Sequence, residues 1–266
     1  MDAVNIRHAD PVPTAAVAGK ESASLRIYWA RHQEDVRAAQ RLRHEVFVEE
    51  MGANLHVPDG VAQGLDVDEY DAHCEHLIVA TTATDDEPSL VVGTYRVMLP
   101  QAAVRAGGYY TETEFDLTAL ARLRPHMAEL GRSCIAGPWR TGGVIMMLWS
   151  HLVRFLLANN ARHAIGCASI PMADGGRVAT RLWREVEQQH LSAEPLRVHP
   201  YVALPVDRLD SAGPTEWPPL VKGYLRCGAK VMGPPAWDPD FGTADLPMLL
   251  DFERMPSAYR KRFAGT

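Results

Sequence analysis

The chain has 266 residues, 47% of them hydrophobic, and its 27 basic and 33 acidic residues give a net charge of -6. This length can bury one substantial core, or at most two modest ones. The acidic balance gives no overall case for a nucleic-acid partner, because phosphate binding normally leaves a basic footprint. The four cysteines are far apart and match neither a zinc site nor a disulfide framework, so we expect reduced thiols in a cytoplasmic protein.

The N-terminal segment and the most apolar segment give no sign of export or membrane insertion. Charged side chains interrupt the N-terminus where a secretion signal needs a continuous apolar region. Residues 1–24 are rich in Ala, Pro, Val and Ser without a period, and we expect a flexible leader. The apolar stretch 142–158 contains His151 and Arg154 and is shorter than the roughly 20 residues that span a bilayer. No transmembrane helix is predicted.

Strands and helices alternate in the first half of the chain. The expected elements are, in order, a strand at 25–30, a helix from 33 that Gly52 ends, a loop at 53–71, and strands at 75–82 and 90–98. The helix is predicted from apolar residues at helical spacing. The two later strands flank the turn segment TDDEPS and predict an antiparallel hairpin.

The second half continues the alternation. The expected elements are a short helix that Asp116 caps before Pro125, a strand at 127–135, a helix that starts at Thr141, a strand at 163–170, a helix near 174–190, a strand around 198–205, a short helix at 218–228, and strands near 229–233 and 244–252. This order predicts an α/β (α+β) fold in which helices flank a mixed sheet. Residues 25–266 are expected to form one domain.

The strand MAELGRSCI places Glu129 and Arg132 close together in apolar surroundings. In a regular strand these two side chains would point to opposite faces. A bulge at Gly131 would bring them to one face, because glycine tolerates the unusual dihedral angles, and bulges are frequent beside active sites. A bulge would also free a backbone N–H for a reacting carbonyl oxygen. A half-exposed ion pair of little energetic value is the plain alternative.

The segment DVDEYDAHCEH (66–76) is dense in carboxylates. Asp68 and Asp71 could bind a cationic substrate. A divalent metal is the weaker hypothesis, because the spacing matches neither a calcium loop nor a zinc helix. A solvated acidic loop is the other interpretation.

Several other residues carry both a structural and a chemical interpretation. His76 opens a predicted strand and is either a structural histidine or a general base. Cys134 has apolar neighbours that favour core packing, and Ser133 lacks the context of a nucleophile elbow. Arg140, Thr141, Gly142 and Gly143 open a helix whose free N–H groups could receive a phosphate or carbonyl, or could form an ordinary cap.

Four motifs in order, RLRHEVFVEEMG, DEYDAHCEHLIV, VVGTYRVMLP and AELGRSCI, resemble the acyl-homoserine lactone synthases and related GNAT-like N-acyltransferases. With the distal segment PPLVKGYLRCGAKVMGPPAWDPDFGTADL, the chain most resembles the ornithine N-acyltransferases of ornithine lipid synthesis, sometimes labelled hemolysin-like. The resemblance extends from about residue 25 onward. It implies a mostly antiparallel, twisted mixed sheet, splayed at its centre where the pantetheine arm of the acyl donor inserts.

The resemblance also implies site residues. The synthase-like positions are Arg43, Phe47, Asp68, Asp71, Arg96, Glu129 and Arg132. In this interpretation Glu129 or His76 is the base, Arg96 or Arg132 binds the carboxylate of the acceptor, and Asp68 or Asp71 binds its side-chain ammonium. Gly131 and Ser133 would contact the acyl donor. Phe47, Met146 and Trp149 would line a channel for the acyl tail, or else belong to the core.

The GNAT enzymes that use acetyl coenzyme A carry Q/R-x-x-G-x-G/A at this helix start. Arg140, Thr141, Gly142 and Gly143 match that pattern only halfway, because Ile145 stands where a small residue belongs. The departure suits a donor carried on acyl carrier protein, with no cofactor and no metal.

The resemblance implies transfer of a long 3-hydroxyacyl chain from acyl carrier protein to the α-amine of L-ornithine, giving lyso-ornithine lipid, with loose peripheral contact to the membrane. One alternative is an acyl-homoserine lactone synthase, which uses S-adenosylmethionine, or another long-chain N-acyl amino acid synthase. An alternative of another class is a non-catalytic protein that binds acyl carrier protein or a membrane surface. The residues leave open which amino acid is acylated and which chain length is preferred.

Overall fold

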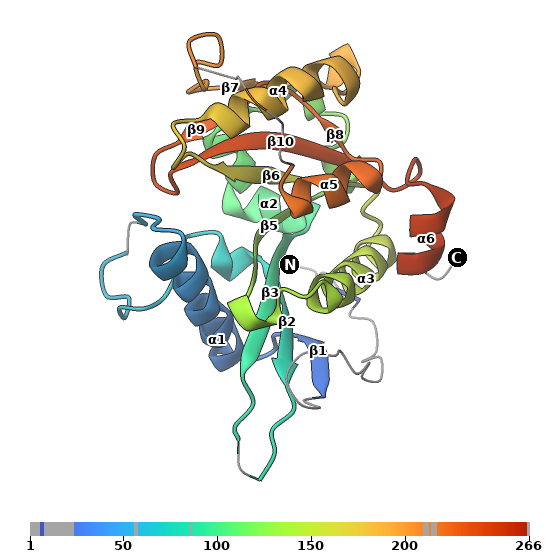
Figure 1. Cartoon of the computed structure of the whole chain (residues 1–266). Coiled ribbons are helices and arrows are strands. Elements are labelled where there is room, and N and C mark those ends of the chain that lie inside the picture. Colours follow the sequence, from blue (N-terminus) through green and yellow to red (C-terminus); the bar gives the residue numbers. More distant parts are fainter. Residues whose placement is uncertain are drawn as a thin grey trace.

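An eight-stranded sheet forms the centre of the protein (Figure 1), here a computed structural model that describes residues 6–7, 24–55, 58–85, 87–209, 213 and 217–264. The strand order is β1-β2-β3-β5-β6-β10-β8, and β9 pairs with β10. All pairings are antiparallel except that of β5 with β6. The predicted mixed, mostly antiparallel sheet is therefore confirmed. Nearly all of the predicted leader lies outside the described residues.

The first half of the chain follows the predicted order and adds two elements that were not predicted, a helix at 100–106 and a two-residue strand at 115–116. Its elements are β1 (Leu25–Trp29), α1 (Gln33–His44), a π-helical turn (Glu45–Glu50), β2 (Glu75–Thr81), β3 (Val91–Met98), α2 (Pro100–Ala106), β4 (Phe115–Asp116) and β5 (Met127–Ile135). Helix α2 was not expected, although Pro100 at its start and Gly107 in the left-handed conformation at its end are standard boundary signals. Gly52, at φ 78°, follows the π-helical turn as predicted.

The second half departs more from the prediction. Its elements are α3 (Gly143–Ala158), β6 (His163–Pro171), α4 (Arg177–Gln189), β7 (His199–Pro200), α5 (Pro219–Arg226), β8 (Lys230–Val231), β9 (Ala236–Asp238), β10 (Thr243–Asp251) and α6 (Ser257–Ala264). The strand expected at 198–205 is reduced to β7, which pairs with β4 in a separate small sheet. Helix α3 starts at Gly143 and not at Thr141, because Gly142 takes φ 92° as its N-cap.

Short 3-10 turns fill several connections. They are Asp71–His73, Tyr110–Thr113, Thr118–Leu120, Arg124–His126, Gly137–Trp139 and Glu194–Leu196. The short helix predicted between Asp116 and Pro125 is one of these turns. Its N-cap is Leu117, which forms no side-chain cap hydrogen bond, so the predicted cap is wrong by one residue, although the backbone N–H of Thr118 donates to the Asp116 carboxylate at 2.9 Å.

The sheet splays between β5 and β6. The two strands pair only from Met127–Glu129 to His163–Ile165, and their ladder ends there, although both strands continue. At that point Gly166 passes so close to the carbonyl oxygen of Leu130 that a Cβ on Gly166 would lie 2.2 Å from it. The predicted splay at the centre of the sheet is therefore present.

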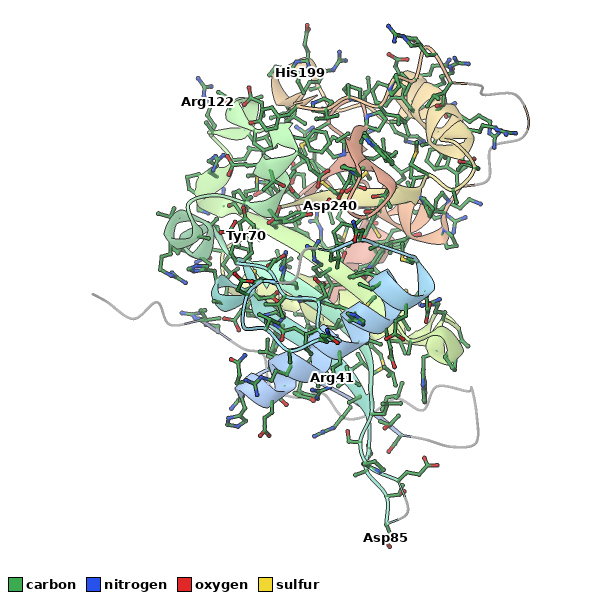
Figure 2. All side chains as sticks on the ribbon, turned by 90° about the vertical axis from the view of Figure 1, so that its left-hand side faces the viewer. Arg41, Tyr70, Asp85, Arg122, His199 and Asp240 are labelled. Carbon is green, nitrogen blue, oxygen red and sulfur yellow. The ribbon has the colours of Figure 1, made fainter. Side chains whose placement is uncertain are left out.

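Helices cover the faces of both halves of this split sheet. Helices α1 and α3 lie beside the β2–β3 half, and α4 and α5 lie beside the β6–β10 half (Figure 1). The apolar stripe of α3 is buried, and the ring centroid of Phe155 lies 4.1 Å from that of Trp29, with the two rings tilted by 34°. The tip of the β2–β3 connection, at Asp85, and His199 of β7 mark opposite ends of the molecule (Figure 2). No helix within the described ranges is both long and apolar enough to cross a membrane.

Candidate functional site

A cavity of about 760 Å³ opens where β5 and β6 separate. Strand β5 and the α3 start form one wall, and residues from β6, α5, β9 and β10 form the other. The sequence-predicted residues that line it are Phe47, Arg96, Glu129, Gly131, Arg132, Ser133, Arg140, Gly142, Met146 and Trp149. One cavity thus collects residues from the first helix, the hairpin, β5 and α3.

The bulge on β5 lies one residue later than predicted. Gly131 pairs with Arg96 and Cys134 pairs with Thr94, so Arg132 and Ser133 together face the single residue between these partners. Arg132 takes the positive φ of 50°, while Gly131 does not adopt a positive φ. The prediction that Gly131 supplies the unusual dihedral is therefore wrong, and Arg132 carries it. Such strain in a non-glycine residue is frequent at functional sites.

Glu129 is a buried carboxylate with a complete set of local donors. The backbone N–H of Tyr110 donates to it at 2.8 Å, and the backbone N–H of Thr111 donates at 2.7 Å. The Thr111 hydroxyl donates as well. Burial raises the pKa of Glu129, and the hydrogen bonds from Thr111 and Tyr110 oppose that rise. The carboxylate is therefore held in one place and is more basic than an exposed glutamate.

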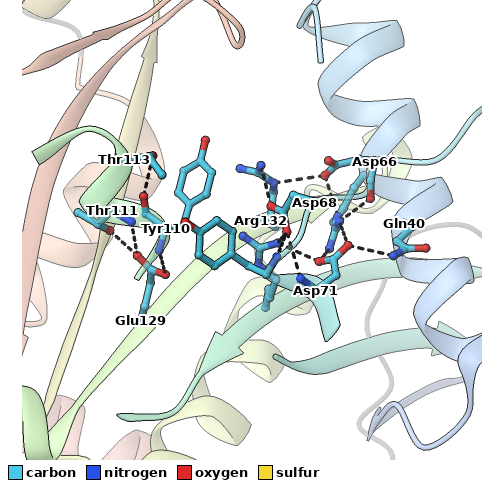
Figure 3. A network of polar contacts seen from close by, with 12 residues as sticks. Gln40, Asp66, Asp68, Asp71, Tyr110, Thr111, Thr113, Glu129 and Arg132 are labelled. Atoms are coloured by element: carbon cyan, nitrogen blue, oxygen red, sulfur yellow. Dashed lines mark hydrogen bonds and ion pairs between the residues drawn. The ribbon is translucent and has the colours of Figure 1, made fainter. Parts of the chain in front are cut away.

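Arg132 projects between two aromatic rings. Its guanidinium carbon lies 4.6 Å from the ring centroid of Tyr110 and 4.6 Å from that of Phe241. Its Nη2 donates to Asp68 at 3.1 Å. Glu129 and Arg132 do line one cavity, as the bulge hypothesis requires. They do not pair directly, because Tyr110 lies between them (Figure 3).

The acidic loop is bound to arginines of the protein itself. Arg43, fully buried, donates to Asp71 through both of its Nη atoms, at 2.9 Å and 2.7 Å, and to Asp66 through Nε at 2.8 Å. Arg96 donates to Asp68 at 2.6 Å and to Asp71 at 2.8 Å. Burial alone would raise the pKa of Asp71, but Arg43 and Arg96 lower it below its ordinary value.

This arrangement corrects the substrate-binding hypothesis for Asp68 and Asp71. Neither residue is among the described residues that line the cavity, and their oxygens are already paired with arginines. Arg43 does not line the cavity either. Asp68 binds both Arg96 and Arg132, and Asp71, which Arg43 holds, binds Arg96. Both Arg96 and Arg132 do line the cavity.

The structure also does not bring His76 to the cavity. Its ring Nε2 lies 3.1 Å from the carbonyl oxygen of Asp71, and the side chain is buried behind the acidic loop. Burial lowers its pKa. The geometry therefore agrees with the structural interpretation of His76 and leaves Glu129 as the base candidate that lines the cavity.

The start of α3 contributes only in part. Arg140 and Gly142 line the cavity, whereas Thr141 and Gly143 are not among the described lining residues. Arg140 is half exposed, pairs with Glu50 at 2.5 Å and donates from Nε to the carbonyl oxygen of Ile135 at 2.8 Å. Cys134 is buried in an apolar cluster, as predicted.

An apolar extension lies behind the main cavity. A second cavity of about 70 Å³ shares Tyr95, Leu130, Trp149, Gly166, Cys167 and Tyr224 with the first. The hydroxyls of Tyr95 and Tyr224 are 2.6 Å apart, and Trp149 stacks on Tyr224. Trp149 therefore borders both cavities, whereas Met146 and Phe47 line only the main one. Together they border space that an aliphatic chain could fill.

Sequence reasoning missed much of the opposite wall. The missed lining residues are Tyr110, Thr111, Asp238, Phe241 and Asp245, and Glu114 lies next to Asp245. Asp238 and Phe241 belong to the PAWDPDF segment, whose unusual composition was the available signal. Nothing in the sequence pattern indicates that the turn at Tyr110 reaches Glu129.

Comparisons with known proteins agree with this architecture. Residues 42–150 match the acetyltransferase (GNAT) domain family. The LasI acyl-homoserine lactone synthase structure superimposes with a TM-score of 0.50 at 14% identity, covering 92% of this chain and 96% of that one, which shows a shared fold. The splayed mixed sheet is therefore the GNAT-like acyltransferase fold.

Relatives of higher identity define the family. The L-ornithine N(alpha)-acyltransferase of Brucella abortus (strain 2308) is 34% identical over 246 residues, which cover 89% of this chain and 87% of that protein. The enzyme of the same name from Rhizobium meliloti (strain 1021) is 32% identical over 264 residues, covering 96% and 88%. The chain belongs to the L-ornithine N(alpha)-acyltransferase family.

Proposed function

We propose that this protein transfers a long-chain acyl group, with or without a 3-hydroxyl, from acyl carrier protein to the α-amine of L-ornithine. The product is lyso-ornithine lipid. The single observation that carries the proposal is Glu129, a buried carboxylate in the cavity at the split of the sheet, in a chain that is 34% identical to a named ornithine acyltransferase.

Glu129 is the proposed general base. The α-ammonium must lose a proton before its nitrogen attacks the thioester carbonyl carbon, and a carboxylate with a raised pKa accepts that proton more readily. The C–N bond then forms, the tetrahedral intermediate collapses, and the C–S bond breaks. The pantetheine thiol leaves as the thiolate and takes up the proton. No covalent bond to the enzyme is required.

The acyl donor is proposed to enter the split between β5 and β6. Beyond Glu129, strand β5 is paired with β3 on one side only, which leaves backbone groups on its other edge available to a pantetheine arm. An N–H of the bulged segment at Arg132 and Ser133 is the proposed donor to the tetrahedral oxyanion, a contribution on the order of 3 kcal/mol at comparable sites. The acyl tail would continue toward Trp149 and Tyr224.

Arg132 and Arg96 are the proposed partners of the ornithine carboxylate. Both line the cavity, and the aspartates that hold them fix their positions before substrate arrives. Preorganised guanidinium groups are the strongest carboxylate receptors that side chains provide.

Acyl carrier protein is the proposed source of the acyl group. The incomplete glycine pattern at α3, and the pairing of Arg140 with Glu50, offer little for a nucleotide pyrophosphate. The product has one acyl chain and a charged head, so we also propose that a cytoplasmic enzyme contacts the membrane surface loosely. Acyl-homoserine lactone synthesis has only the shared fold in its favour, at 14% identity.

The test is a reconstituted reaction. Purified protein is incubated with acyl carrier protein thioester and an amino acid panel, with free thiol and product mass as readouts. We expect thiol release that requires ornithine, with acyl-ornithine as the product. Formation of acyl-homoserine lactone from S-adenosylmethionine would refute the proposal and indicate a lactone synthase. Binding of the acyl carrier protein without thiol release would indicate a non-catalytic binding protein.

A further inference from the structure

The buried arginines at the active-site cavity already pair with aspartates of the protein, whereas some carboxylates of the cavity have no basic partner. Asp66, Asp68 and Asp71 hold Arg43, Arg96 and Arg132 on one side of the cavity. The three aspartates of the acidic loop are therefore already paired, and its exposed Glu69 does not line the cavity, so this loop does not supply the receptor for the side-chain ammonium of a diamino acid. A different receptor is needed if ornithine is the acceptor.

A second acidic group lies on the opposite wall. Asp238 of β9 and Asp245 of β10 both line the cavity and are 8% and 4% exposed. They lie on paired strands, where Asp238 faces Thr243 and Asp245 faces Ala236. Within the described parts of the chain, neither forms an ion pair with a basic side chain within 4.0 Å. Two buried carboxylates without a cation are unusual.

Glu114 adds a third carboxyl directly beside this wall. Oxygens of Glu114 and Asp245 and the Cys167 sulfur all lie within 4.8 Å of one another. The Glu114 and Asp245 carboxyls hydrogen-bond to each other, and Asp245 also accepts from the hydroxyls of Thr243 and Ser169. Asp238 accepts from the backbone N–H groups of Asp240 and Phe241. The three carboxyls are therefore fixed in place by neutral groups, and the two that line the cavity have no basic partner within 4.0 Å among the described residues.

We infer that Asp238 and Asp245, the latter hydrogen-bonded to Glu114, bind the side-chain ammonium of the diamino acid acceptor and so select ornithine over amino acids without a second amine. The inference rests on the proposed function. A primary ammonium supplies a positive charge and several N–H donors. Buried carboxyls without a basic partner are suited to bind such a group.

The position of the cluster fits one substrate that bridges two sites. The Thr111 hydroxyl donates to Glu129. The same hydroxyl oxygen lies 4.0 Å from the sulfur of Cys167, and that sulfur lies beside Glu114 and Asp245. The base and the acidic cluster are thus separated by two small side chains. An acceptor whose α-amine lies at Glu129 can reach Asp245 with its methylene chain and terminal ammonium.

Titration of the cluster gives a signature on the unmodified protein. Burial, reinforced by Asp245 and Asp238, raises the pKa of Glu114 to about 9, and burial raises that of Asp245 to about 6. The charged or titratable groups that face them are Asp238, Cys167, Glu129, Arg132 and Tyr110. An ammonium binds the ionised carboxyls, so its binding strengthens as pH rises through these values.

The experiment compares ornithine with norvaline, which has the same carbon skeleton without the terminal amine. For the natural sequence we expect a kcat/KM ratio of ornithine to norvaline on the order of 10³ at pH 8. Asp238→Asn and Asp245→Asn should each lower that ratio by about tenfold or more, mainly through the KM for ornithine. Asp251→Asn, at the far end of β10, is the matched control and should leave the ratio unchanged.

The pH dependence is measured on the natural sequence and does not depend on the folding of any variant. The ratio of kcat/KM for ornithine to that for norvaline should fall as pH is lowered from about 9 to 6. Titration of the α-amine does not affect this ratio, because the α-amine is common to both substrates. A flat ratio, or a ratio that both asparagine variants preserve, overturns the inference while ornithine acylation itself stands. Loss of the preference with EDTA and its return with zinc would also overturn it, because the cluster would then hold a metal. No acylation of any amino acid would instead refute the proposed function.

Discussion

Tyr110 connects Arg132 to Glu129 across the candidate active site. Its ring lies 4.6 Å from the Arg132 guanidinium carbon, and its backbone N–H donates to the Glu129 carboxylate at 2.8 Å. The proposed base and the proposed carboxylate receptor are therefore positioned by one residue, from a turn that joins no strand of the main sheet.

Replacement of the proposed base tests its role directly. Glu129→Gln keeps the shape of the side chain but removes its proton affinity, so kcat should fall by roughly 10² to 10⁴. The same steady-state assay on Glu187→Gln, an exposed residue of α4, should give the natural rate. A kcat within a factor of about two of the natural value in Glu129→Gln would exclude Glu129 as the base.

The raised pKa of Glu129 predicts the acid limb of the pH–rate profile. A base acts in its deprotonated form, so kcat/KM should decline as pH falls through the raised pKa, above the ordinary 4.5 of a glutamate. The profile should be recorded with norvaline as well as ornithine, because the acidic cluster affects only the diamine. An acid limb at or below the ordinary glutamate value in both profiles would contradict the role.

Arg132→Met should weaken the binding of the acceptor carboxylate while leaving the sheet in place. Loss of a guanidinium partner to a carboxylate should raise the KM for ornithine by about 10²-fold. Arg162→Met removes a guanidinium that is 61% exposed and should have no effect, which makes it the control. Equal KM values for the two variants would assign carboxylate binding to another residue.

Arg43→Met tests the support beneath the site. Removal of Arg43 leaves Asp71 paired only with Arg96 and Asp66 only with Arg132, so their buried charge is compensated only in part, and the free energy of unfolding should fall by about 3 kcal/mol at pH 7. Urea denaturation followed by circular dichroism measures this loss.

The sign of the pH effect follows from Asp71. Its folded pKa lies below the ordinary 3.8, so its contribution to stability is present above that value and is lost as pH falls toward the folded pKa. The natural protein should lose more stability than Arg43→Met between pH 5 and strong acid. A parallel loss in both proteins would show that Asp71 is not the group responsible.

Gly166→Ala tests the close contact between Gly166 and Leu130 at the point where β5 and β6 separate. An added Cβ would meet the Leu130 carbonyl oxygen at 2.2 Å, so the strands must shift, at a cost of about 1–3 kcal/mol in unfolding free energy. Gly131→Ala is the control for stability, because its Cβ would have no neighbour within 4 Å. If the two variants have the same urea midpoint, the contact at Gly166 does not constrain the split.

Local sequence patterns were sufficient for the elements that have a strong period or clear boundaries. The apolar spacing of α3, the hairpin of β2 and β3, and the strand at β5 all appear where they were predicted. Strand β7 is shorter than predicted, and α6 was not predicted because its residues have no strong apolar period. Elements with such weak local patterns form because of the surfaces that they pack against.

The sequence by itself determined the class of fold, the order of the motifs and the presence of Glu129 and Arg132 on one bulged strand. Only the tertiary structure decided that the acidic loop is neutralised by Arg43 and Arg96, that His76 supports that loop, and that Asp238 and Asp245 face the cavity. The reason is physical: whether a carboxylate is free to bind a ligand depends on which cation lies within a few ångströms, and these arginine–aspartate partners are 23 or more residues apart in the chain.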